Sequence, residues 1–191
     1  RFNSQVLDTS TANSTFNTIN WTEPYPYGEE LPNNRYDEKA GANGRLSGAN
    51  MSGNVLLMHF NNDTLDYSGL GNDGTGFNGV ICNSTMTTGV FLGSCEFDGV
   101  NDYVDIFSFN KTFPYSNFTI SMWIKPGYYS VAGFHHPRLF YYYNGSQQWQ
   151  VWIRDNSNNR LSFDNGTTGG VYSTELPPLN SWTYVTFVKQ D

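Results

Sequence analysis

The sequence predicts an all-β fold, a two-sheet antiparallel β-sandwich with an N-terminal strand-like arm and linker. Hydrophobic and polar residues alternate over several short runs, as in strands with one buried face. Asn-Gly pairs follow two of these runs, at 144–145 and 165–166, and such pairs favour tight turns. No amphipathic helical pattern longer than about two turns is present. Short strands separated by Asn and Gly turns are typical of a sandwich.

The expected strands can be placed from these alternating runs. In 117–125 the apolar positions of one face are Phe118, Ile120, Met122 and Ile124. In 182–189 one face carries Thr183, Val185 and Phe187, and the opposite face carries Trp182, Tyr184 and Val188. We expect further strands at 55–60, 90–97, 103–107, 138–143, 148–154 and 160–164.

The run at 148–154 forms a hairpin with 138–143 through Asn144 and Gly145. Its alternation places Trp149, Val151 and Ile153 inside. The positions expected outside are Gln148, Gln150, Trp152 and Arg154.

Three segments differ in composition. We expect 1–23 to be a strand-like arm or the tail of a preceding β-module, because it carries one or two alternating runs. Residues 24–54 are rich in Pro, Tyr, Gly, Ala and Asn, which is linker composition. The main sandwich is expected at 55–191.

The composition narrows the classes of partner. Of 191 residues, 17% are aromatic and 14% charged, against about 25% charged in a typical globular chain, so the chain is not of the disordered type. The net charge of −7 and the absence of a basic run argue against nucleic acid. No apolar stretch approaches the ~20 residues that span a bilayer, so we expect no membrane insertion in this segment.

Asparagine is unusually frequent, and it often stands in glycosylation sequons. With 23 Asn and 34 Ser plus Thr, chance predicts roughly four Asn-x-Ser/Thr sequons. Nine occur, at Asn13, Asn20, Asn50, Asn62, Asn83, Asn110, Asn117, Asn144 and Asn165. Asn-rich loops can produce sequons by accident, but this excess favours a secreted, heavily N-glycosylated surface protein.

The two cysteines point to the same compartment. Cys82 and Cys95 close a loop of 14 residues. Two buried free thiols are the alternative, but beside so many sequons a disulfide is the better prediction. A metal site at these cysteines is not expected, because no second Cys pair or nearby His completes a tetrahedral ligand set.

Five motifs follow one another in a recognisable order: HFNN at 59–62, DYSGLGNDGT at 66–75, FDGVNDYV at 97–104, FTISMWIKP at 118–126 and WTYVT at 182–186. In that order they resemble the laminin-G-like branch of the concanavalin-A-like lectin/glucanase superfamily. The resemblance covers roughly 55–191 and implies a jelly-roll sandwich. Members continue past the last motif with further strands, so we expect the sandwich to be truncated at its C-terminal end. This fold hosts binding, adhesive, structural and hydrolytic proteins alike.

The segment 1–34 resembles the tail and linker of a β-module in long, secreted, multi-module surface proteins, many of them archaeal. We therefore interpret the chain as an internal piece of such a protein. Its partners would be neighbouring modules or copies of itself.

The sequence does not predict an enzyme. Hydrolytic relatives place two or three carboxylates at alternating strand positions. No expected strand carries Glu-x-x-Glu, and Glu-x-Asp occurs only at Glu96, where Asp98 lies just beyond the strand expected at 90–97. Glu96 has no acidic partner except Asp98 at the end of its strand, and is best explained as an exposed strand residue. His59 is expected to be half-buried, and His135 and His136 would point to opposite faces.

One polar turn could hold calcium. The oxygens of Asp66, Ser68, Asn72 and Asp73 recur at short spacing among glycines, and Ca²⁺ requires about six to eight oxygen ligands. Relatives often carry a structural calcium in this kind of turn. The alternative is a turn whose carboxylates cap backbone N–H groups. Both interpretations stay open at this point.

Sugar binding requires exposed aromatic rings beside amide or charged groups. The candidates are Tyr142 and Trp152 for stacking, with Gln150 and Arg154 as polar partners. The alternative is that the aromatic residues fill the core. The preferred function is a non-catalytic, glycosylated extracellular structural or adhesive module of a surface layer or filament. The alternative is a carbohydrate-binding module, with or without calcium.

Overall fold

The computed structural model describes residues 31, 51–83, 89–109, 117–129, 137–146, 148–154, 160–164 and 170–190. These residues contain ten β-strands and no α-helix, which confirms the all-β prediction. The arm at 1–23 and almost all of the linker at 24–54 lie outside the described residues. The described residues contain no helix that is long and apolar enough to cross a membrane.

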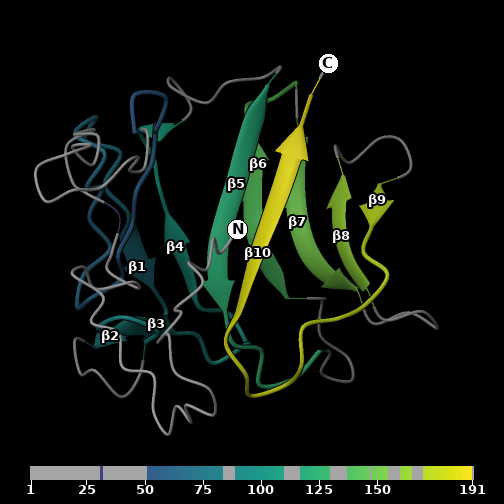
Figure 1. Cartoon of the computed structure of the whole chain (residues 1–191). Coiled ribbons are helices and arrows are strands. Elements are labelled where there is room, and N and C mark those ends of the chain that lie inside the picture. Colours follow the sequence, from purple (N-terminus) through teal and green to yellow (C-terminus); the bar gives the residue numbers. More distant parts are fainter. Residues whose placement is uncertain are drawn as a thin grey trace, which may run out of the picture.

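Two layers of antiparallel strands stack face to face (Figure 1). One layer is the pair β5 (Phe118–Ile124) and β10 (Thr183–Lys189). The other is a four-stranded sheet in chain order, made of β6 (Arg138–Tyr143), β7 (Gln148–Arg154), β8 (Arg160–Asp164) and β9 (Val171–Tyr172). The two-sheet sandwich predicted from alternation is therefore confirmed.

The core lies between these layers because each strand turns its apolar positions toward the other layer. Val151 is fully buried and Ile153 is 2% exposed. The buried members of the core are Phe109, Phe118, Ile124, Tyr142, Val151, Ile153, Leu161, Phe163 and Val185. Burying one such side chain stabilises the fold by roughly 1.5–3 kcal/mol. The apolar face predicted for β5 is confirmed as the inward one, with Ile120 and Met122 packed against the buried set. In β10 the inward face is that of Val185 and Phe187.

Two small sheets lie beside the sandwich, on the left in Figure 1. β1 (Thr75–Phe77) pairs with β4 (Tyr103–Asp105), and β2 (Ile81–Asn83) pairs with β3 (Ser94–Glu96). The strands predicted at 90–97 and 103–107 are thus shorter than expected. A turn separates them, in which Asp98 Oδ1 accepts a hydrogen bond from the backbone N–H of Val100 at 2.8 Å.

The prediction of a strand at 55–60 is wrong, because the structure forms no strand there. The backbone of Leu57 bonds to a loop instead of a ladder: its N–H donates to Asp66 Oδ1 at 3.0 Å, and its carbonyl accepts from Tyr67 N–H at 2.7 Å. Phe60, at φ 58°, then takes the left-handed conformation, which ends any extended run.

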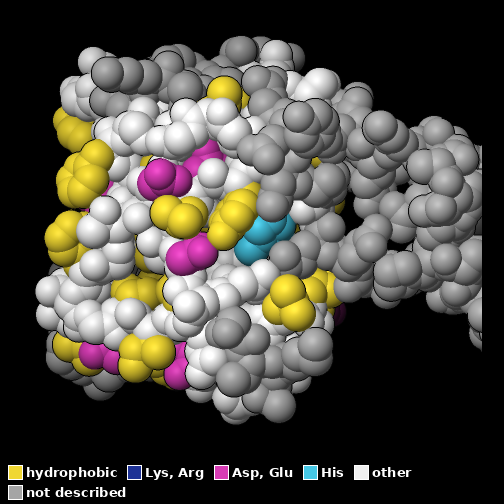
Figure 2. Space-filling view, turned by 90° about the vertical axis from the view of Figure 1, so that its left-hand side faces the viewer, with side chains coloured by type: hydrophobic (Ala, Val, Ile, Leu, Met, Phe, Trp, Pro, Cys, Tyr) yellow, Lys and Arg dark blue, Asp and Glu magenta, His cyan; other side chains and the backbone are white. Residues whose placement is uncertain are grey.

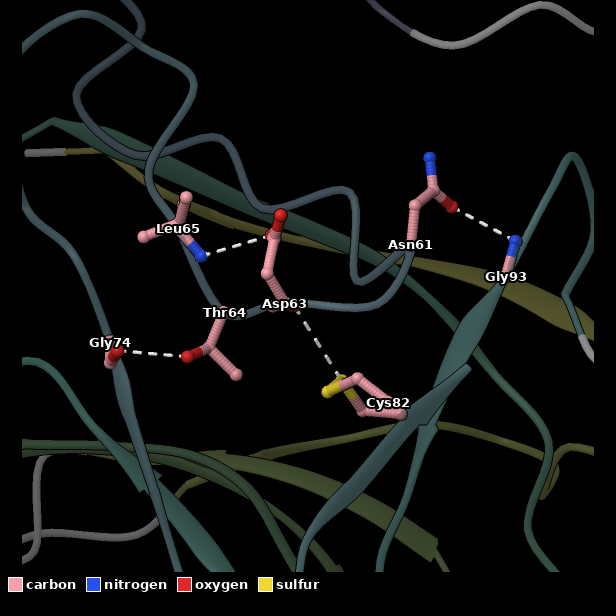
Figure 3. The surroundings of a disulfide bond; sticks show 8 residues. Asn61, Asp63, Thr64, Leu65, Gly74, Cys82 and Gly93 are labelled. Atoms are coloured by element: carbon pink, nitrogen blue, oxygen red, sulfur yellow. Dashed lines mark hydrogen bonds between the residues drawn. A yellow bond between two sulfur atoms is a disulfide. The ribbon is translucent and has the colours of Figure 1, made fainter. Parts of the chain in front are cut away.

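The predicted disulfide between Cys82 and Cys95 is confirmed. The two residues face each other across β2 and β3, with Cα atoms 4.0 Å apart. Cys95 Sγ lies 3.9 Å from the carbonyl oxygen of Asp63, and Gly93 N–H donates to Asn61 Oδ1 at 2.9 Å (Figure 3). The disulfide hairpin therefore supports the loop at 61–65.

Replacing both cysteines by serine is expected to lower the free energy of unfolding by about 3 kcal/mol, the value for a loop of roughly 15 residues. Denaturant unfolding of the double variant measures this loss. Wild-type protein treated with a reducing agent is the control and should lose a similar amount. Equal unfolding midpoints for variant, reduced and oxidised protein would contradict a stabilising role.

Candidate functional site

The outer face of the four-stranded sheet, turned away from β5 and β10, carries most of the predicted sugar-binding positions. Val151 and Ile153 point into the core, so alternation along β7 directs Gln150 and Trp152 outward. Trp152 is half-buried, whereas Gln150 is only 6% exposed. The backbone of Arg154 continues this face, but its side chain lies outside the described residues.

Tyr142 was predicted to be exposed, and this is wrong. It is 5% exposed and packs in the core with Val151 and Phe163. The β6–β7 register places Tyr142 opposite Trp149, and residues directly opposite share a face. Tyr141 and Tyr143 occupy the outer face instead, with 48% and 56% of their surface exposed.

A buried carboxylate organises this outer face. Asp164 on β8 is 8% exposed and lies opposite Gln150. Its Oδ1 accepts from Gln150 Nε2 at 2.7 Å, and its Oδ2 accepts from Trp152 Nε1 at 2.9 Å. The hydroxyl of Ser162, which is fully buried, also donates to Oδ2 at 3.2 Å. A buried charge is tolerated only when it is well hydrogen-bonded, and these three donors meet that requirement for Asp164. The same contacts hold the indole of Trp152 and the amide of Gln150 in fixed orientations.

Further polar and aromatic side chains surround this network. The guanidinium carbon of Arg138 lies 5.0 Å from the ring centroid of Tyr141, within the range of a cation–π contact. Arg160, on β8, is half-buried. We define the polar outer face by Arg138, Tyr141, Gln150, Trp152, Arg160, Ser162 and Asp164. Arg138 and Tyr141 are its exposed members, Trp152 and Arg160 are half-buried, and Gln150, Ser162 and Asp164 are buried beneath them.

Sequence reasoning missed Arg138, Arg160, Ser162 and Asp164. The pattern at 160–164 does alternate between polar and apolar residues, so it contained the signal that its polar positions share one face. What it did not contain was the pairing of Asp164 with Gln150, which depends on the register of β7 and β8.

The turn proposed for calcium uses its oxygens differently. Asp66 Oδ1 accepts from the N–H groups of Leu57 and Ser68 at 3.0 and 2.8 Å. Asp66 Oδ2 accepts from Asn72 N–H at 2.9 Å and from the Ser68 hydroxyl at 2.8 Å. Asp73 Oδ1 accepts from the N–H of Asp66 at 2.9 Å.

These contacts fit the capping alternative and do not fit a ready calcium site, because the carboxylates face backbone donors rather than a common point. In the part of the chain that the structure describes, no group of three or more His, Cys, Asp or Glu is placed to hold a metal. Burial raises the pKa of Asp66, but the hydrogen bonds from Leu57, Ser68 and Asn72 outweigh it and hold that pKa below the usual value of 3.8.

The other layer also exposes aromatic side chains. On the outer face of β5 and β10, Trp123 is 41%, Tyr184 53% and Val188 54% exposed. The rings of Trp123 and Tyr184, which are paired across the strands, have centroids 5.2 Å apart. Together with Ser121 and Thr186, whose hydroxyl oxygens lie 3.3 Å apart, they form what we call the aromatic outer face.

The residues considered for catalysis are dispersed. His59 is half-buried, as expected, and its ring centroid lies 4.8 Å from that of Tyr67. Glu96 is exposed on β3, away from the four-stranded sheet. His135 and His136 lie outside the described residues.

Four of the nine sequons can be examined. Asn62, Asn83 and Asn117 are exposed and Asn144 is half-buried. The remaining five, at Asn13, Asn20, Asn50, Asn110 and Asn165, lie outside the described residues.

Comparison with known proteins gives one family. Residues 98–191 match the family model described as "Concanavalin A-like lectin/glucanases superfamily". No curated protein and no solved structure gives a significant match to the chain.

We expect Asp66→Asn to lower the free energy of unfolding by roughly 1–3 kcal/mol at neutral pH, since backbone donors then lose their charged acceptor. Because the pKa of Asp66 is lowered in the folded state, its contribution is present above the unfolded pKa of about 3.9 and is lost as pH falls through the folded value. The difference in the free energy of unfolding between the wild type and the variant should therefore shrink below about pH 4.

Denaturant unfolding between pH 2 and pH 7 measures this difference. Glu96→Gln, which changes an exposed carboxylate, is the matched control and should leave the stability nearly unchanged. A gap between wild type and Asp66→Asn that stays constant down to pH 2 would refute the capping role.

Proposed function

Residues 98–191 belong to the concanavalin A-like lectin/glucanase superfamily, and from this premise we propose that the protein is a non-catalytic, glycosylated extracellular module with a structural or adhesive role in a surface layer or filament. The disulfide supports an oxidising compartment. The exposure of Asn62, Asn83 and Asn117 supports glycosylation, because an N-glycan requires an accessible amide.

The aromatic outer face is the observation that carries the adhesive role. Trp123, Tyr184 and Val188 are each more than 40% exposed on one sheet face. Contiguous apolar side chains on a protein surface commonly mark an interaction site, and Trp and Tyr contribute strongly to interfaces. The partner would be a neighbouring module or another copy of the chain.

The absence of catalysis is part of the proposal. A glycosidase of the usual kind places two carboxyl groups about 5–10 Å apart across a cleft. Among the residues that the structure describes on the outer face of β7 and β8, Asp164 is the one carboxylate, and both of its oxygens accept hydrogen bonds from neighbouring side chains.

Light scattering on the native glycoprotein tests the adhesive role. We expect the wild-type protein to form assemblies heavier than one chain. Trp123→Ser combined with Tyr184→Ser should shift the measured mass toward that of a single chain. Tyr141→Ser combined with Tyr143→Ser, on the other layer, is the matched control and should leave the distribution unchanged. A wild-type protein that stays a single chain at high concentration would sink the adhesive proposal.

Carbohydrate binding is the second candidate, and the hydrogen-bonded set of Asp164, Gln150 and Trp152 favours it. Buried Asp164 and Gln150 hold the half-buried indole of Trp152 in place on a sheet face that also exposes Tyr141 and Tyr143. Sugar-binding surfaces combine aromatic rings with fixed polar groups in this way. Calcium dependence is a separate proposal, and it requires the carboxylates of Asp66 and Asp73 to turn from their backbone donors toward the ion.

A glycan array with the purified protein tests the second candidate. We expect binding to at least one polysaccharide and a loss of up to about tenfold in affinity with Trp152→Ala, since one stacking contact is worth roughly 0.5–1.5 kcal/mol. A chelator should leave binding unchanged if the carboxylates at 66–73 only cap the backbone. Trp123→Ala is the matched control on the other layer. Absence of binding to every polysaccharide would eliminate this candidate.

A further inference from the structure

The small sheet of β1 and β4 has one exposed face that carries three aromatic rings. The register pairs Phe77 with Tyr103 and Thr75 with Asp105, and residues directly opposite share a face. The rings of Phe77 and Tyr103 stack with centroids 4.9 Å apart, and the Phe107 ring meets Phe77 edge-on at 6.2 Å. Tyr103 is 47% and Phe107 70% exposed. The three rings therefore form an open aromatic surface.

The opposite face of the same two strands packs against the body of the protein. A Cβ atom added at Gly76 would lie 3.4 Å from the Cβ of Val80, and one added at Gly74 would lie 3.0 Å from the side chain of Met58. Val104, which pairs with Gly76, is half-buried on this side. The aromatic surface is thus the side of the sheet that a partner can reach.

Asp105 brings a carboxylate into this aromatic surface. It is half-buried and lies two residues after Tyr103 on β4, so the two side chains share a face. The contact between Phe107 and Phe77 places Phe107 on that face as well. In the part of the chain that the structure describes, Asp105 forms no hydrogen bond and no ion pair. Because the faces of aromatic rings carry partial negative charge, the rings and the carboxylate together attract a cation.

The sequence around this surface supplies no cation. Residues 51–109 contain seven Asp and Glu and no Lys or Arg. Figure 2, which looks onto the side of β1 to β4, shows carboxylates among hydrophobic side chains and no Lys or Arg among the described residues. Charge complementarity therefore favours a positively charged partner.

We propose that Phe77, Tyr103, Asp105 and Phe107, which we call the acidic aromatic face, bind an arginine side chain of a partner protein. A guanidinium is planar, so it can stack on an exposed ring while its donors reach the carboxylate of Asp105. This inference goes beyond the adhesive role of β5 and β10, because it uses another sheet and does not require a second copy of the chain.

Short immobilised peptides test the proposal on the native glycoprotein. The probes are three peptides of equal length in which Ser alternates with Arg, with Lys or with Gln. We expect the Arg peptide to bind about tenfold more tightly than the Gln peptide. It should also bind more tightly than the Lys peptide, because an ammonium group lacks the planar fork. The Lys peptide has the same charge and so controls for attraction by the net charge of −7.

Two variants of the acidic aromatic face should weaken binding of the Arg peptide by about fivefold each. Asp105→Asn removes the carboxylate, and Phe107→Leu removes a ring but keeps an apolar side chain. Glu96→Gln, at another exposed carboxylate, and Tyr184→Leu, at an exposed ring on β10, are the matched controls. Both controls should keep the affinity within about twofold of the wild type. Asp105→Asn should unfold at the wild-type temperature or above, because Asp105 has no bonding partner to lose.

Equal affinities for the Arg, Lys and Gln peptides would overturn the proposal. Equal losses with Asp105→Asn and Glu96→Gln would overturn it too, since the attraction would then come from the overall negative charge. An unchanged affinity for Phe107→Leu would show that the ring takes no part, and a loss with Tyr184→Leu would place the binding on β10. None of these results depends on the self-association that light scattering tests, so the two proposals fail separately.

Discussion

The packing of β5 and β10 onto the inner face of the four-stranded sheet is the constraint on which the rest of the structure depends. Val151 and Ile153, fully buried and 2% exposed, fix which face of β7 is internal. Once that face is fixed, the period of two directs Gln150 and Trp152 outward with no remaining freedom. The polar outer face is therefore a consequence of the core, because a shift by one residue would turn Val151 and Ile153 out of it.

On that outer face, polar groups are fixed by one another. Asp164 is as buried as many core residues, yet it is a carboxylate, and donors from β7 and β8 satisfy it. In the proposed carbohydrate-binding role, side chains that are already ordered would lose little entropy when a ligand binds. The turn at Asp66 applies the same chemistry to backbone N–H groups, where it shapes a loop instead of a surface.

Sequence alone could predict features set by local patterns. The inward faces of β5 and β7 follow from alternation, and the disulfide follows from two cysteines in a sequon-rich chain. Features set by pairing could not be predicted in this way. The prediction that Tyr142 is exposed was wrong because the face of Tyr142 depends on its pairing with Trp149. Asp164 was missed because the donors of Gln150 and Trp152 lie on another strand.

Residue-resolved hydroxyl-radical footprinting of three consecutive tyrosines tests the assignment of the two sheet faces most directly. Tyr141 and Tyr143 are 48% and 56% exposed, whereas Tyr142 between them is 5% exposed. The account predicts oxidation of the first and third and protection of the second, as tandem mass spectrometry would show. Oxidation of Tyr142 at the rate of its neighbours would mean that β6 pairs in another register and that the polar outer face does not exist as described.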